Sequence, residues 1–522
     1  MNGALDPAGQ ARKLTLRNSA RTRRMPDWNA AAATADAIAG AWEDGPGGAF
    51  LLFDRDGIRG GAAGGLASLE HRIPFTAATP SRYASISKHF LAATLLLEGF
   101  DLGAPLGALV PGLSPAIGAV PLGRALDMTG ALPDAMELFW QRGQPFTASL
   151  APEDAFALLA GCDATNAPPG TEMAYSNSGW RLAQRALPDY AATLRQRLLD
   201  PLGLPIAFPR DEAEPVAGLA TGYWRDGRHW RRGRYGMHFS ASGGLAGSAE
   251  ALAGWASALL SGHGPLAGML DRLAAPRAFA DGSPGAYRLG LVETALAGTR
   301  LLAHGGSLPG YRNHLLMAPE QGMGVVLLTN REEEALWPAL RVMAALLGKP
   351  MPRPAANPTG LYAAAEGPFW AEFTPGAMSF MGGHEALVED GPEGFRSLPA
   401  YLDIRLKPAP DGALQGLVGG ALRCLRPVPP DTPLDPGLPG LWREPRSGAT
   451  ILVRSDGTAR FPGLGGLGVE TPLTPLPGGR ALASLLHGPW RHRPCLRREG
   501  DTLHLASHRA RVLQFCRQED VP

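Results

Sequence analysis

Long apolar segments are missing from this chain. No run of 18 apolar residues occurs, which argues against a membrane-spanning helix. Residues 1–25 are polar and basic, without the apolar core of a secretory signal peptide. We therefore expect a cytoplasmic protein that does not associate with a membrane. The formal net charge of +1 likewise gives no electrostatic basis for binding nucleic acid.

Cysteine is scarce as well. The chain has four cysteines that form no C-x-x-C pair, which argues against a disulfide framework. The 12 histidines include no H-E-x-x-H motif and no tight Cys/His cluster, so we expect neither a metal site nor a cofactor. Residues 463–468 match G-x-G-x-x-G literally. They lead into proline-rich sequence rather than a helix, which argues against a dinucleotide site.

Lysine is scarce among the charged residues. Only four of the 49 Lys and Arg residues are lysines, and one of them, Lys88, follows Ser85 by three positions. A serine hydroxyl is a weak nucleophile until a base takes its proton, and a lysine one helical turn later lies on the same face. The pair therefore predicts acyl transfer through Ser85. A helix N-cap is the plain structural alternative for this serine.

The first two thirds of the chain mix helical and strand patterns. We expect helices over 27–42, 85–99, 152–160, 177–186, 249–260 and 332–347. Short apolar runs bounded by turn residues predict strands over 48–53, 299–304, 312–319 and 324–329. Hairpin-connected strands between helices indicate the α+β class, with an antiparallel sheet flanked by helices.

Two proline-rich linkers, 349–357 and 429–437, divide the remainder. Beyond the first, short apolar runs alternate with Gly, Pro and Asp turns, which is typical of small antiparallel β domains. We expect a flexible N-terminal arm over 1–26 and a catalytic domain over 27–348. Two small β-barrel domains, 358–428 and 438–522, would follow.

Two further motifs stand at the ends of expected elements. Y-S-N at 175–177 comes just before a helix, and H-G-G at 304–306 comes at the end of a strand. Together with Ser85, Lys88 and the segment 66–75, they resemble the serine β-lactamase and penicillin-binding-protein superfamily, of the class C type. The histidine in the third motif, the length and the two C-terminal β domains are similar to the bacterial D-aminopeptidases. In that family, a catalytic domain precedes two antiparallel β-barrels.

The resemblance implies a role for each motif residue. Ser85 would form an acyl-enzyme, Lys88 would take its proton, and Tyr175 would protonate the leaving group. Lys88 or Tyr175 needs a pKa shifted from about 10 to act as a base at neutral pH, and the sequence leaves open which one does. Asn177 would hold Lys88 and the substrate amide. The backbone N–H groups of Ser85 and Ser307 would form the oxyanion hole.

Two further residues complete the expected site. His304 would extend the hydrogen-bond network and carry charge only when protonated. Arg312, on the next strand, is a candidate for substrate binding or for a structural salt bridge. Tyr175 and His304 as packing residues, and Asn177 as a helix cap, are the alternatives.

In the D-aminopeptidases, a loop from the last barrel carries an acidic residue that meets the amino group of the substrate. The stretch that resembles this loop is 484–490, which supplies His487 as a candidate substrate-binding residue. It contains no Asp or Glu, and the nearest acid upstream is Glu470. A preference for an apolar or neutral acyl group is therefore an open alternative.

The resemblance implies a serine hydrolase that acts on a small-molecule or peptide substrate through an acyl-enzyme. A D-aminopeptidase, releasing an N-terminal D-residue or glycine from peptides, amides or esters, is the first expectation. A carboxylesterase or β-lactamase-like hydrolase on the same scaffold is the alternative. An inactive ligand-binding homologue is the second alternative. The family also implies a homodimer.

Overall fold

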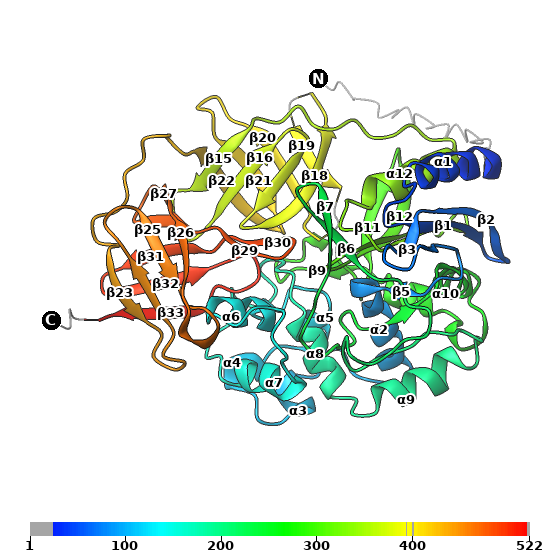
Figure 1. The fold of residues 1–522 in the computed structure, drawn as a ribbon, viewed down its shortest axis with the longest axis horizontal. Helices are drawn as coiled ribbons and strands as arrows, with labels where there is room; N and C mark the ends of the chain where they lie inside the picture. Colours follow the sequence, from blue (N-terminus) through cyan, green and yellow to red (C-terminus); the bar gives the residue numbers. More distant parts are fainter. Residues whose placement is uncertain (1–24, 393, 399–400, 519–522) are drawn as a thin grey trace, which may run out of the picture.

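The computed structural model describes residues 25–392, 394–398 and 401–518. The arm expected over 1–26 lies outside this part of the chain, apart from its last two residues. Figure 1 shows a helix-and-sheet unit, coloured blue to green, beside two β units coloured yellow to red. The fold is therefore β-lactamase-like, with C-terminal antiparallel β-barrels, as the sequence predicts.

The catalytic unit is built on one antiparallel sheet of order β11-β12-β13-β14-β1-β2. The first and last thirds of the unit meet here, because β1 pairs with β14 along its whole length. The strands are β1 (Gly48–Asp54), β2 (Gly57–Gly64), β11 (Val292–Leu296), β12 (Thr299–Leu308), β13 (Tyr311–Ala318) and β14 (Met323–Thr329).

Helices cover both faces of this sheet. Alternate residues of β1 point to opposite faces. Phe50 joins a buried cluster with α1 (Trp28–Gly40) and α12 (Leu336–Leu347), whereas Leu51 joins the main core with α2 (Lys88–Leu97) and α10 (Ala249–Ser261). Burial on both faces explains why β1 reads as a continuous apolar run.

A helical lobe lies below the sheet in Figure 1. It contains α3 (Leu106–Leu109), α4 (Pro115–Gly118), α5 (Leu122–Leu126), α6 (Ala135–Gln141), α7 (Pro152–Ala160), α8 (Ser178–Arg185) and α9 (Tyr190–Leu194). The unit also contains the helix α11 (Met269–Leu273) and the two-stranded sheet of β6 (Tyr223–Asp226) and β7 (His229–Arg232).

Two helices begin later than the sequence pattern predicts. The helix expected from residue 332 begins at Leu336, because the Glu334 carboxylate accepts the backbone N–H groups of Leu336 and Trp337. The helix expected over 85–99 is split into a 3₁₀ turn over Ala84–Ser87 and the α-helix α2. Ser85 and Lys88 therefore lie across a junction between two kinds of helix.

The first β unit is a closed, antiparallel, eight-stranded barrel. Its strands are β15 (Gly360–Ala364), β16 (Trp370–Thr374), β17 (Ala377–Phe380), β18 (Gly383–Asp390), β19 (Gly394–Leu398), β20 (Ile404–Pro408), β21 (Leu414–Val418) and β22 (Ala421–Pro427). Trp370, Phe373 and Phe380 fill its interior at 3% exposure or less. Because β15 pairs with β22, the barrel is closed, and its described strands leave no unpaired edge of the kind that an open sheet exposes.

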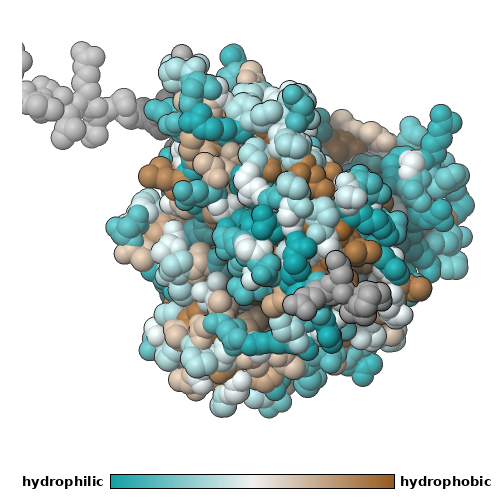
Figure 2. Space-filling view, turned by 90° about the vertical axis from the view of Figure 1, so that its left-hand side faces the viewer, coloured by the Kyte–Doolittle hydropathy of each residue, from teal (hydrophilic) through white to brown (hydrophobic). Residues whose placement is uncertain are grey.

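The second β unit is an antiparallel sheet of nine strands. They are β23 (Gly440–Arg443), β24 (Thr450–Val453), β25 (Thr458–Phe461), β26 (Val469–Pro472), β27 (Thr474–Leu476), β28 (Arg480–Leu482), β31 (Cys495–Glu499), β32 (Thr502–Ala506) and β33 (Leu513–Arg517). Its two edges are β26 and β27, which follow one another along the chain with only Leu473 between them. The sheet is therefore nearly closed on itself. Figure 2 shows the side of the molecule that lies at the left in Figure 1. Its surface is mostly hydrophilic, with separate apolar groups.

One buried carboxylate joins all three units. Glu172 lies in the catalytic unit and accepts hydrogen bonds from Arg423 of the first barrel and Arg511 of the second β unit. In the described part of the chain, no helix is long and apolar enough to cross a membrane.

Candidate active site

A strained backbone position presents Ser85. Ala84 has a φ of 51°, a conformation that non-glycine residues rarely adopt. The strand β12 approaches this turn very closely, since a Cβ placed on Gly306 would lie 2.3 Å from the carbonyl oxygen of Tyr83. The glycine of the third motif is thus required for β12 to lie beside the nucleophile.

Lys88 and Tyr175 both contact the Ser85 hydroxyl. The Lys88 Nζ lies 3.0 Å from Ser85 Oγ, and the Tyr175 hydroxyl lies 2.9 Å from it. The Lys88 Nζ also donates to Asn177 Oδ1 at 2.9 Å and to the carbonyl oxygen of Ser242 at 2.7 Å. The structure therefore brings together five residues from three separate parts of the sequence, 85–88, 175–177 and 242.

Burial moves the pKa values of the two groups in opposite directions. Burial, reinforced by the charge of Arg509, lowers the pKa of Lys88 well below its usual value. Burial also raises the pKa of Tyr175. A lysine that loses its proton readily can act as a base, whereas a tyrosine that keeps its proton can donate it.

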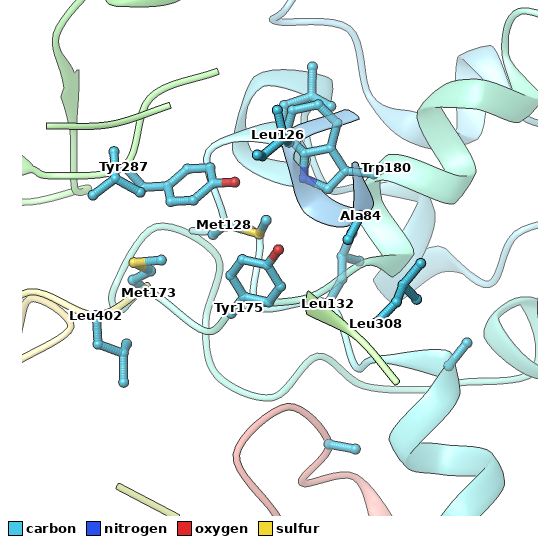
Figure 3. Close-up of a cluster of buried hydrophobic side chains, with 14 of the residues drawn as sticks. Ala84, Leu126, Met128, Leu132, Met173, Tyr175, Trp180, Tyr287, Leu308 and Leu402 are labelled. Carbon is cyan, nitrogen blue, oxygen red and sulfur yellow. The ribbon is translucent and has the colours of Figure 1, made fainter. Parts of the chain in front are cut away.

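The Tyr175 ring is enclosed by apolar and aromatic groups from two units. Figure 3 shows it in a cluster of buried side chains that includes Met128 and Met173. The ring of Tyr401, from the first barrel, meets it edge-on at 4.7 Å between centroids. These neighbours fix the ring and account for the raised pKa of its hydroxyl.

His304 lies one layer behind the reacting groups. Its Nε2 is 2.8 Å from the Tyr287 hydroxyl, and the Tyr287 ring packs edge-on against Tyr175. Its Nδ1 lies 2.6 Å from the carbonyl oxygen of Gly305, which can only accept, so Nδ1 carries the proton. Burial lowers the pKa of His304 well below its usual value, so the ring is neutral and Nε2 accepts from Tyr287.

Asn177 faces the site rather than the helix that it precedes. It occupies the N-cap position of α8, yet its side chain makes no capping bond and accepts from Lys88 instead. Its backbone N–H donates to Asp134 Oδ2 at 2.8 Å. The buried Asp134 also caps α6 through its Oδ1, so it positions both a helix and Asn177. No motif in the sequence marks this aspartate.

Ser307 and Arg312 lie on facing positions of β12 and β13 at the mouth of the site. The Arg312 guanidinium donates to Ser307 Oγ at 2.6 Å and pairs with Glu332 at 2.5 Å. Both residues line the pocket that holds Ser85. Arg312 therefore forms the structural salt bridge that was the alternative to substrate binding, and it also lines the pocket that a substrate would enter.

The stretch 484–490 forms the hairpin of β29 (Leu485–His487) and β30 (Trp490–His492), and it reaches the pocket. Trp490 lines the pocket, and its indole N–H donates to Glu332 Oε1 at 2.9 Å. His487 instead stacks on Trp140 at 5.5 Å, behind this wall. Burial lowers the pKa of His487, so its ring is neutral there.

The pocket has a volume of ≈790 Å³ and is formed by all three units. Sequence reasoning missed Asp134, Glu332, Tyr401 and Arg509, because they come from separate segments without a motif. Trp490 lies in the expected loop 484–490, but the candidate taken from that loop was His487. Among the described residues, no group of three His, Cys, Asp or Glu side chains could hold a metal ion. A serine between a base and a proton donor, in a pocket of this size, can carry out acyl transfer.

Known sequences match the larger part of the chain. A family model described as Beta-lactamase matches residues 34–347. A D-aminopeptidase of Gluconobacter oxydans is 28% identical over 330 residues, which cover 61% of this chain and 62% of that protein. A D-aminopeptidase of Brucella ovis is 29% identical over 326 residues, which cover 60% of this chain and 62% of the relative. The match thus spans less than two thirds of these relatives' own length.

Solved structures share the fold at low sequence identity. The octameric penicillin-binding protein homologue from Pyrococcus abyssi matches with a TM-score of 0.52 and 18% identity, covering 90% of this chain and 95% of that one. EstCE1, a hydrolase with promiscuous acyltransferase activity, matches with a TM-score of 0.51 and 19% identity, covering 61% and 99%.

Proposed function

Because the chain belongs to the beta-lactamase family, we propose that it is a serine hydrolase that works through an acyl-enzyme on Ser85. We propose that it is a D-aminopeptidase, which releases an N-terminal D-residue or glycine from peptides, amides or esters. The simultaneous contact of the Ser85 hydroxyl with Lys88 and Tyr175 carries this proposal. The D-aminopeptidases that match at 28–29% identity support the choice of substrate.

In the proposed reaction, Lys88 is the general base. The Ser85 hydroxyl gives its proton to the neutral Lys88 amine as Oγ forms a bond to the substrate carbonyl carbon. The lowered pKa of Lys88 supports this role, since its neutral form is available closer to neutral pH. Asn177 Oδ1 and the Ser242 carbonyl oxygen hold the nitrogen beside Ser85.

Tyr175 is the proposed proton donor to the leaving group. Its hydroxyl gives a proton to the departing nitrogen as the carbon–nitrogen bond breaks and the acyl group stays on Ser85. The raised pKa of Tyr175 keeps the proton in place until then. His304 supports this step indirectly, because its neutral ring fixes Tyr287, whose ring packs against Tyr175. Water then attacks the acyl carbon and the bond to Oγ breaks, with Oγ taking one proton from the water. The proton that Lys88 holds returns to Tyr175.

The backbone N–H groups of Ser85 and Ser307 are the proposed oxyanion hole. The close approach of Gly306 to the turn before Ser85 supports this pairing, because it brings β12 beside the nucleophile. Arg312 and His487 are proposed to shape the substrate site. Arg312 would act from the rim, and His487 through its stacking on Trp140.

A carboxylesterase on the same scaffold is the second candidate. The observation that favours it is the hairpin over 484–490, which reaches the pocket without an Asp or Glu to meet a substrate amino group. We further propose that the protein acts in the cytoplasm. We also propose that it forms a homodimer, and light scattering of the purified protein would test this oligomeric state.

Hydrolysis of D-Ala-, L-Ala- and Gly-p-nitroanilide, measured beside p-nitrophenyl acetate, tests the proposal. We expect the wild type to cleave the D-Ala and Gly substrates far faster than the L-Ala substrate. Ser85→Ala should abolish this activity. Ser85-dependent ester turnover without any D-Ala-p-nitroanilide cleavage would replace the aminopeptidase by the esterase.

A further inference from the structure

One arginine of the second β unit lies in the pocket beside the reacting groups. Arg509 stands in the loop between β32 and β33, and its guanidinium carbon lies 4.7 Å from the centroid of the Tyr175 ring. Its side chain lines the same pocket as Ser85. A cation therefore stands next to the proposed proton donor, about 420 residues along the chain from the nucleophile.

The loop that carries Arg509 is fixed to the catalytic unit from both sides. The backbone N–H of Arg509 donates to Glu137 Oε2 at 2.8 Å, and its carbonyl oxygen accepts from the Asp134 N–H at 2.9 Å. The Asn166 side-chain amide also donates to this carbonyl at 2.9 Å, and Gln141 bonds Ser507 Oγ and the carbonyl oxygen of Ala510. These bonds fix the backbone of the loop from which the guanidinium extends.

The carboxylates that line the pocket already have partners. Glu332 and Glu372 pair with arginines, and Glu333 pairs with Arg331. Glu334, Glu385 and Glu137 accept backbone N–H groups. Each of these carboxylates therefore has at least one partner within the protein.

The Arg509 guanidinium, in contrast to these carboxylates, has no close charged partner in the part of the chain that the structure describes. Among the described residues, its guanidinium has no carboxylate oxygen within 4.0 Å and no hydrogen-bond partner. Asp134 and Glu137 attract the guanidinium from a distance, but Asp134 bonds Asn177 and the Glu137 carboxylate bonds the backbone N–H of Arg509. An arginine stays charged at any ordinary pH, and a partly buried, unpaired guanidinium is a ready site for a carboxylate. Arg181, on the same wall, is likewise bonded only to uncharged groups in the described part of the chain.

We propose that Arg509 binds the free carboxylate of the leaving residue, which makes the preferred substrate a dipeptide or similar amide with a carboxylate directly after the cleaved bond. The proposal rests on the proposed function, in which Tyr175 protonates the leaving nitrogen. An α-carboxylate carbon lies about 2.5 Å from the amide nitrogen of the same residue. A carboxylate whose nitrogen lies at the Tyr175 hydroxyl can therefore reach the cation that covers the Tyr175 ring.

Paired substrates test this inference. We compare kcat/KM for D-Ala-Gly and D-Ala-glycinamide, which differ only in the carboxylate of an achiral leaving residue. The wild type should prefer D-Ala-Gly roughly ten- to hundredfold, as expected for a desolvated charge-assisted pair. In Arg509→Gln this ratio should fall to near 1, and Arg509→Lys should give an intermediate ratio. Arg443→Gln, an exposed arginine on β23 of the same unit, should keep the wild-type ratio.

The possible failures are distinguishable. Equal kcat/KM for both substrates in the wild type overturns the inference, even where Arg509→Gln does not fold. An unchanged ratio in a folded Arg509→Gln, with both activities reduced alike, also overturns it and leaves Arg509 only its effect on Lys88. D-Ala-p-nitroanilide has no carboxylate in its leaving group. Its cleavage by the wild type therefore tests the aminopeptidase activity without any contribution from carboxylate binding at Arg509.

Discussion

At the scale of single residues, burial shifts the pKa values of Lys88 and Tyr175 in opposite directions and so favours a different role for each. Lys88 loses the solvation of its charged form, and Tyr175 loses the solvation of its anion. The sequence identifies both residues but leaves their order open, because each has a reference pKa near 10. The directions of the two shifts favour Lys88 as the base and Tyr175 as the donor.

This assignment predicts the pH dependence of acylation. Lys88 must be neutral to take the Ser85 proton, so activity is present above its pKa and is lost as the pH falls through it. Because that pKa is lowered, the acid limb of kcat/KM for D-Ala-p-nitroanilide should lie well below pH 10.5. Arg509→Gln should move the limb to higher pH, because the Arg509 charge helps to lower this pKa. A limb that stays in place in this variant would contradict the coupling.

Tyr175→Phe should separate amides from activated esters. The variant keeps the packed ring but lacks the proton donor, so cleavage of D-Ala-p-nitroanilide should fall about 10²- to 10⁴-fold. Turnover of p-nitrophenyl acetate should fall much less, since p-nitrophenolate leaves without a proton. Tyr287→Phe is the matched control, because it breaks only the bond to His304. Equal losses on both substrates would show that Tyr175 acts elsewhere in the reaction.

At the scale of secondary-structure elements, the contact between β12 and the turn before Ser85 sets the site. Gly306→Ala would place a Cβ 2.3 Å from the Tyr83 carbonyl oxygen, so β12 must move. A displacement of about 1 Å in a catalytic group can reduce activity about 100-fold, and we expect a loss of that order in kcat together with a lower Tm.

A second glycine provides the control for this prediction. A Cβ at Gly40, in α1, meets nothing within 4 Å, so Gly40→Ala should keep its activity and gain about 0.5–1 kcal/mol in unfolding free energy. Wild-type kcat in Gly306→Ala would show that β12 tolerates the shift.

The sequence predicts those parts of the site that local geometry determines. Ser85 and Lys88 are three residues apart, and the motifs of Tyr175 and His304 mark the ends of elements, so all four can be found by spacing and resemblance. The helix expected from residue 332 shows the limit of periodicity, because the cap by Glu334 decides where α12 begins. Arg509 and Tyr401 could not be found, since only the packing of the β units brings their loops to the pocket.

At the scale of the whole molecule, Glu172 joins the three units. Arg423 and Arg511 both bond its buried carboxylate, so Glu172→Gln leaves two partly buried guanidinium groups without their charge partner. Removing one partner of a buried pair costs about 3–5 kcal/mol, and we expect a loss of this order in chemical denaturation.

An exposed ion pair provides the comparison. Asp163 and Arg446 also connect the catalytic unit to the second β unit, but their side chains are 75% and 50% exposed. Asp163→Asn should therefore cost less than about 1 kcal/mol. Equal losses for the two substitutions would show that burial of Glu172 contributes nothing to the connection.

The position of the 507–511 loop also determines the order in which the pocket is completed during translation. A ribosome that has reached the linker at 349–357 has already made Ser85, Lys88, Tyr175 and Ser307. The wall that bears Arg509 is still untranslated at that point. The groups that break the bond are thus synthesised well before the group proposed to select the substrate, and the pocket lacks this wall until residues beyond 500 have emerged and docked.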